Sequence, residues 1–215
     1  MQEQTQFDSV EAAELAGDLR PLLELIGSPT GLGALAAAAD PLLVPRLDSL
    51  PALRNFLKHY HEAVLQPLEL PAIHRAFLHA SRNELRELLA FDAALAGEPK
   101  LKPFVSASRL VGQSQLLRLR PLRDHRVVQR YIAAVDAGQA QGWHTLVYGL
   151  TLAVYSLPPR QGLLNYARLT SRGFIQSAAR SIALSADESR ALLDELCSSL
   201  PAAIEATLAP TIAQV

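Results

Sequence analysis

Apolar side chains recur at steps of three and four residues along most of this chain, which is the spacing of a helix that buries one face. The stretch 50–66 shows this spacing clearly, with apolar side chains at Leu53, Phe56, Leu57, Tyr60 and Val64. No stretch shows the sustained apolar and polar alternation of a half-buried strand, and aromatic residues make up only 6% of the sequence. We therefore predict an all-α fold in which residues 1–215 form a single domain, an irregular helical bundle of about eight or nine helices.

Prolines, glycines and capping residues divide the chain into the expected helices. The stretches 81–84 (Ser-Arg-Asn-Glu) and 185–188 (Ser-Ala-Asp-Glu) both match the capping box. Pro67 and Pro71 are expected to separate two helices, because proline removes a helical hydrogen bond. The predicted helices span residues 9–25, 50–66, 71–79, 81–95, 106–119, 127–135, 143–157, 160–182 and 185–200.

The helix predicted at 143–157 is apolar on nearly every side, which places it at the centre of the bundle with the helix at 160–182 as its partner. Gly149 lies within it, where glycine costs about 1 kcal/mol relative to alanine. We interpret Gly149, and Gly112 in the helix at 106–119, as positions where another helix approaches closely. In the helix at 106–119, the side chains expected to face the core are Leu110, Val111, Leu116 and Leu117.

Motifs typical of catalytic, nucleotide or metal sites are absent from the sequence. There is no phosphate-binding loop, Gly-x-Ser-x-Gly, Cys-x-x-Cys or His-Glu-x-x-His. His59 and His61 are two residues apart, which puts them on different faces of a helix, and His74 and His79 miss the one-turn spacing of a zinc pair. The single cysteine, Cys197, is expected to be a small core side chain. We expect neither a catalytic site nor a metal site, so the chain is not predicted to be an enzyme.

Arginines cluster in the middle of the chain, although the formal net charge is -1. They are Arg109, Arg118, Arg120, Arg123, Arg126 and Arg130, with Asp124 as the only acid among them. A solvated helix face is the interpretation that we favour, and a nucleic-acid-binding helical module is the alternative. Such modules are normally more basic and carry a recognisable docking motif, so we expect no nucleic-acid partner.

The N-terminus (Met-Gln-Glu-Gln) has neither the basic start nor the apolar region of a signal peptide. The longest strongly apolar run, 146–157, is shorter than the roughly twenty residues of a membrane-spanning helix. A lone cysteine allows no intramolecular disulfide, which is compatible with a reducing compartment. These features predict a cytoplasmic protein with no membrane partner.

Four short motifs occur in one order along the chain. The strongest is 144–150, His-Thr-Leu-Val-Tyr-Gly-Leu; before it lie Asp92-Ala93-Ala94-Leu95 and the stretch 108–112 (Ser-Arg-Leu-Val-Gly) with a leucine pair at 116–117. After it come Tyr166, Ser171 and the stretch 177–180 (Ser-Ala-Ala-Arg). In order and spacing they resemble the motifs of the urease accessory protein UreF family: His-Pro-Val-x-x-Gly, Asp-x-x-Leu, Ser-x-x-Met-Gly and Ala-x-Arg-Leu.

The chain also departs from the family pattern. After Arg180 the family's Leu-x-Pro-Leu-Gly-Gln becomes Ser-Ile-Ala-Leu-Ser-Ala, and Pro-Phe-Val at 103–105 replaces the Glu-x-Arg expected before Ser108. The family's N-terminal signature survives at most as Ser28-Pro29. Residues 1–50 are therefore expected to be a divergent N-terminal region.

The resemblance implies a non-enzymatic scaffold or chaperone for nickel insertion into apo-urease. It implies a homodimer that binds a UreD/UreH-type accessory protein and, through that complex, a UreG-type GTPase; nickel is handled by the complex, and this chain binds no cofactor tightly. The partner-binding or fold-critical residues that the resemblance carries over are Gly112, His144, Tyr148, Gly149 and Arg180. A UreF-like paralogue that scaffolds another complex is a further alternative.

Overall fold

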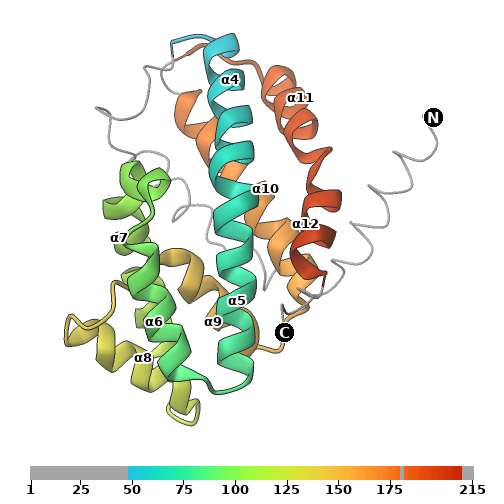
Figure 1. Ribbon diagram of the computed structural model, residues 1–215. Coiled ribbons are helices and arrows are strands. Elements are labelled where there is room, and N and C mark those ends of the chain that lie inside the picture. The colour runs from blue at the N-terminus through green and yellow to red at the C-terminus, as the bar shows by residue number, and fades with distance from the viewer. Residues whose placement is uncertain (1–47, 180–181, 210–215) are drawn as a thin grey trace.

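The computed structural model describes residues 48–179 and 182–209, so Arg180 and the helix expected at 9–25 lie outside the described residues. Every regular element in the described ranges is helical, as Figure 1 shows. The all-α class predicted from the apolar periodicity is therefore confirmed. The helices are α4 (Leu50–Tyr60), α5 (Leu70–Ser81), α6 (Leu85–Leu95), α7 (Val105–Leu119), α8 (Arg126–Asp136), α9 (His144–Val154), α10 (Pro159–Ala178), α11 (Ala186–Cys197) and α12 (Leu200–Leu208).

The prediction that Pro67 and Pro71 separate two helices is wrong. A π-helical segment, η2 (His61–Glu69), joins α4 to α5, and the three form one rod through the middle of the molecule (Figure 1). Wide π turns accommodate Pro67, which would clash with a carbonyl four residues earlier in an α-helix. At the end of the segment, the Leu70 amide donates to the Leu65 carbonyl, five residues back. The expected helix count is slightly off, partly because of this fusion.

Of the two capping boxes predicted from the sequence, the structure contains one and lacks the other. At 185–188 the capping box is present, with the Ser185 hydroxyl accepting from the Glu188 amide and the Glu188 carboxylate accepting from the Ser185 amide. At 81–84 the prediction is wrong, because Ser81 ends α5 and its hydroxyl donates to the Phe77 carbonyl. The helix expected to run to residue 200 instead breaks after Cys197, since Pro201 opens α12.

Helix α9 lies at the centre, as its composition predicts. Residues 144–152 of this helix are all buried, and it packs chiefly against α5 on one side and α7 on another. A Cβ atom on Gly149 would overlap the Ile73 carbonyl oxygen of α5. A Cβ atom on Gly112 of α7 would likewise overlap the Gly142 carbonyl oxygen, just before α9. Both glycines therefore allow the close approaches that the sequence predicts.

Helix α7 buries a narrower face than expected. Its Ser108 and Gly112 face α9 and are buried, as are the expected core residues Val111 and Leu116. Leu110 and Leu117 are instead 62% and 60% exposed, so their predicted burial is wrong. At 100° per residue, both lie about half a turn around the helix from Ser108, away from α9. In the described part of the chain, no helix combines the length and apolar character needed to cross a membrane.

Candidate functional site

Two buried polar networks hold the N-terminal end of α9. The first centres on Asp92 of α6, which is fully buried. Its carboxylate accepts hydrogen bonds from the Tyr131 hydroxyl at 2.6 Å and from the amides of Gln141 and Gly142 at 2.6 and 3.1 Å. The Trp143 indole nitrogen donates to the main-chain carbonyl of Asp92 at 3.1 Å. One side chain therefore fixes the loop that leads into α9, and the positive end of the helix favours its negative charge.

The second network runs from α7 through α9 to α10. The Ser108 hydroxyl lies 2.6 Å from Nδ1 of His144 and accepts from the His144 amide at 3.3 Å. On the other side of the imidazole, Nε2 is hydrogen-bonded to the Tyr166 hydroxyl. Tyr166 in turn donates to Oε2 of Glu69 at 3.1 Å. A chain of hydrogen bonds therefore joins Ser108, His144, Tyr166 and Glu69 inside the bundle.

Glu69 owes its position to the π-helical segment. The Tyr60 hydroxyl donates to Oε2 of Glu69 at 2.6 Å, although the two residues are nine apart on one rod. Nine residues of α-helix make two and a half turns, which would put the two side chains on opposite faces. In the wider turns of η2 each residue turns the chain through a smaller angle than in an α-helix. Glu69 is therefore brought to the same face as Tyr60.

The hydrogen bonds assign the proton positions in this network. Since Tyr166 gives its only proton to Glu69, Nε2 of His144 must donate to the Tyr166 oxygen, and Nδ1 then accepts from Ser108. Burial lowers the pKa of His144 to about 3, so the imidazole is neutral. Burial raises the pKa of Glu69 to about 7, although the hydrogen bonds from Tyr60 and Tyr166 act in the opposite direction. Glu69 therefore changes its charge near neutral pH.

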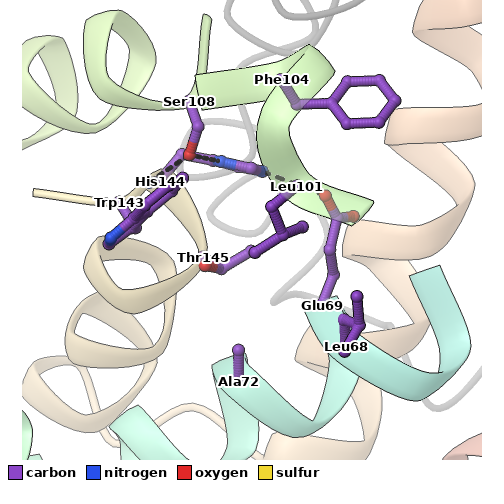
Figure 2. Close-up of a pocket in the computed structure, with 9 residues that line it drawn as sticks. All are labelled: Leu68, Glu69, Ala72, Leu101, Phe104, Ser108, Trp143, His144 and Thr145. Carbon is purple, nitrogen blue, oxygen red and sulfur yellow. Dashed lines mark hydrogen bonds and ion pairs between the residues drawn. The ribbon is translucent and has the colours of Figure 1, made fainter. Parts of the chain in front are cut away.

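A small cavity adjoins the network, and Figure 2 shows Ser108, His144 and Glu69 around it, each from a different helical element. The space that the centre of a water molecule can occupy within it is about 10 Å³, so the cavity holds one water at most. Oε1 of Glu69, the oxygen that does not receive the tyrosine protons, lies 4.0 Å from Nε2 of His144. The cavity is too small for an organic substrate, so the network's evident role is to fix α7, α9, α10 and the rod against one another.

Of the expected site residues, the four that the structure describes are all buried. His144 belongs to the second network; the Tyr148 hydroxyl donates to the Gly162 carbonyl at 3.0 Å. Gly112 and Gly149 lie at the close approaches on α7 and α9. None of the four reaches the surface, so their contribution in this conformation is to the packing around α9. The assignment of Arg180 to partner binding stays a prediction, since Arg180 is outside the described residues.

Glu69 and Tyr60 are the functional residues that sequence analysis missed. Tyr60 appears there only as a member of an apolar stripe, and Glu69 does not appear at all. One signal was present: Glu69 is the lone acid between Val64 and Ile73, a stretch that is otherwise almost wholly apolar. A carboxylate in such a run is typical of a buried, hydrogen-bonded group.

Histidine and cysteine residues outside the two networks form no metal site in the described ranges, where no group of three or more His, Cys, Asp or Glu side chains could hold an ion. His61 is buried and bonded to Ser171 at 2.7 Å, and burial lowers its pKa to about 4. Cys197 is half-buried, and burial raises the pKa of its thiol to about 11. This thiol is therefore unreactive at neutral pH.

The arginine cluster lies on the exposed surface of α7, α8 and the turn between them. Arg120 donates from one terminal nitrogen to both carboxylate oxygens of Asp136, at 2.7 and 2.9 Å. Exposed pairs of this kind contribute about 0 to 1 kcal/mol to stability. The favoured interpretation, a solvated helix face, agrees with this exposure.

The motif residues that sequence analysis singled out come from separate stretches and meet in these networks: Asp92 in the first, and Ser108, His144 and Tyr166 in the second. A scan against protein-family models matches UreF over residues 49–197. The chain belongs to the UreF family. UreF proteins are urease accessory proteins, so a role in urease maturation together with other accessory proteins follows from the family. None of the curated proteins compared with this UreF chain matches it.

Proposed function

We propose that this protein is a non-enzymatic scaffold for nickel insertion into apo-urease. In this proposal it forms a homodimer, binds a UreD/UreH-type accessory protein, and through that complex engages a UreG-type GTPase. The observation that supports the proposal most is the family match over 49–197, within which the motif residues from four stretches converge on the N-terminal end of α9.

The geometry of the site supports a scaffold role. The buried networks join α6, α7, α9, α10 and the central rod, whereas the cavity beside them admits one water at most. Polar groups inside a core cost free energy unless every partner is in place, so such networks favour one specific arrangement of helices. A rigid core of this kind suits a protein that presents surfaces to partners, with nickel handled by the complex as cargo.

The test is urease maturation in a host that expresses the cognate structural and accessory genes, with and without this chain. We expect nickel content and urease activity of the purified urease to fall by at least about tenfold without it. Tagged protein should bring down the UreD/UreH-type protein, and its mass in light scattering should be that of a dimer. Unchanged nickel content together with no captured accessory protein would refute the urease role.

The purified chain should neither hydrolyse GTP nor bind nickel with submicromolar affinity. Such binding by a tag-free chain in calorimetry would assign it a direct metal role instead.

A further inference from the structure

The small cavity beside Glu69 adjoins a carboxylate oxygen that neither buried network satisfies. Oε2 of Glu69 accepts hydrogen bonds from the Tyr60 and Tyr166 hydroxyls. No described residue donates a hydrogen bond to Oε1: Nε2 of His144 lies 4.0 Å from it and is bonded to Tyr166 instead. Buried carboxylate oxygens cost free energy unless they are hydrogen-bonded, so a further partner is expected in the space beside Oε1.

The wall of this cavity is partly polar. The polar side chains that line it are Glu69, Ser108, His144 and Thr145 (Figure 2). The Ser108 oxygen accepts from one main-chain amide and can accept a second hydrogen bond, and the Thr145 hydroxyl can donate or accept. Apolar cavities stay dry, whereas a buried water needs roughly two to four polar partners. Oε1 of Glu69 and the two hydroxyl groups meet this requirement.

The room in the cavity restricts the kind of ligand. A space of about 10 Å³ for the centre of a water molecule is near the minimum that one water needs, and it excludes any organic ligand. Calcium and magnesium ions take about six to eight oxygen ligands, whereas only three of the lining residues have side-chain oxygens. One water is therefore the ligand that fits the cavity best.

Glu69 changes its charge near neutral pH, so the partner of Oε1 has to suit two states of the carboxyl group. In the ionised state Oε1 accepts a hydrogen bond. In the protonated state Oε1 carries the proton and donates it, because Oε2 already accepts from two hydroxyls. Water can donate in the first state and accept in the second, whereas a cation serves only the first. The titratable side chains that face this carboxyl are Tyr60, His144 and Tyr166, and Lys100 and Lys102 of the adjoining segment η3 (Pro99–Phe104) are exposed.

We infer that the cavity binds one structural water, which is hydrogen-bonded to Oε1 of Glu69 and to the Ser108 and Thr145 hydroxyls. This water joins the rod to α7 and α9 and completes the second network. Because the water can donate or accept, Glu69 gains and loses its proton without a rearrangement of the helices. The site lies inside the chain, so the inference goes beyond the proposed urease role and does not depend on it.

Methyl NMR of the full-length chain, labelled at its alanine methyl groups, tests the inference at pH 6 and pH 8. The Ala72 methyl lines the cavity, whereas the Ala76 methyl, one turn further along α5, is also buried but packs beside Gly149. The cross-peak from Ala72 to water should be at least about fivefold stronger than that from Ala76 at both pH values, with the sign of a long-lived bound water. A missing cross-peak at either pH would overturn the inference.

Two variants of Glu69 test whether the carboxyl group anchors the water. Glu69→Gln keeps a polar atom in place of Oε1 and should retain the cross-peak at Ala72. Glu69→Leu has no polar atom there and should weaken the cross-peak at least about fivefold, because the remaining hydroxyls hold the water less well. An undiminished cross-peak in a folded Glu69→Leu would overturn the inference. If Glu69→Leu does not fold, loss of the cross-peak in Glu69→Gln would do so.

A crystal structure of the wild-type chain at about 1.5 Å resolution or better provides a second test. One density peak should lie in the cavity, about 2.6 to 3.2 Å from Oε1 of Glu69. A cavity without such a peak would overturn the inference. A bound monovalent cation is excluded by melting temperatures at pH 8 that are unchanged when sodium chloride is replaced by choline chloride at equal ionic strength. A lower melting temperature in choline chloride would identify a cation in place of the water and would also overturn the inference.

Discussion

Gly112 of α7 lies so close to the loop before α9 that a Cβ atom at this position would overlap the carbonyl oxygen of Gly142. The obstacle is backbone, which the Asp92 carboxylate holds through the amides of Gln141 and Gly142. The close approach and the first polar network are therefore parts of one arrangement: the loop cannot move away from Gly112 without breaking hydrogen bonds to a buried carboxylate.

Gly112→Ala should reduce the free energy of unfolding by at least about 2 kcal/mol, because the added methyl group forces α7 away from the loop. Gly97→Ala is the matched control, since a Cβ atom there meets only the Ala94 carbonyl oxygen at 3.4 Å. Urea denaturation of the two variants measures the difference. Equal stabilities would show that α7 can shift at little cost.

Asp92→Asn should cost about 2 to 4 kcal/mol of stability. The carboxylate accepts from three donors, and the amide nitrogen of asparagine would turn one acceptor into a donor that faces another donor. Asp136→Asn removes a carboxylate from an exposed pair with Arg120 and should cost less than about 1 kcal/mol. Thermal melts of both variants provide the comparison, and a similar loss from each would contradict the buried network.

Glu69 should make stability depend on pH between about 4.5 and 7. Its pKa rises from 4.5 to about 7 on burial, so in this window the folded chain keeps a proton that the unfolded chain has lost. The contribution of Glu69 to the free energy of unfolding is therefore full below pH 4.5 and is lost as the pH rises to 7, by up to about 3 kcal/mol.

Glu69→Gln cannot titrate, so it isolates this contribution. The stability of the variant relative to wild type should rise from pH 5 to pH 8. His144 and His61 act in the opposite direction: burial lowers their pKa values to about 3 and about 4, and their contributions are lost as the pH falls below 6.5. Because both histidines remain in the variant, the difference between the two proteins reports Glu69. A difference that is constant from pH 5 to pH 8 would refute the raised pKa.

Tyr148→Phe should lower stability by about 1 to 2 kcal/mol, because it leaves the buried Gly162 carbonyl without the hydroxyl that donates to it. Tyr155→Phe is the control, since Tyr155 is 42% exposed and should change stability by less than about 0.5 kcal/mol. Calorimetry on the two variants decides between a role for the Tyr148 hydroxyl and a role for its ring alone.

Periodicity predicts much of this fold because a helix that buries one face must repeat its apolar residues with the helical period. It predicts α9 as the centre of the bundle. It also predicts Gly112 and Gly149 as close approaches, because a glycine within a packed helix leaves room for a neighbouring segment. It fails for Leu110 and Leu117, because an apolar residue in a helical pattern does not reveal which face is covered. It fails for Tyr60 and Glu69 because their pairing depends on a change of helical period that α-helical spacing does not contain.

Because the helical period changes within the segment 61–69, the number of residues in this segment determines which face of α5 meets the core. Deleting one residue there and closing the gap as regular α-helix would turn everything after it by about 80° relative to α4, because eight α-helical steps make about 800° whereas the present nine steps make about two full turns. Glu69 would leave the face of Tyr60, Ile73 and Ala76 would turn away from α9, and part of the polar side of α5 would enter the core. Substitutions at its two exposed positions, Glu62 and Pro67, can be absorbed, but insertions and deletions cannot. Relatives that share this core are therefore expected to differ in loop lengths and termini while keeping the same number of residues between the tyrosine and the glutamate.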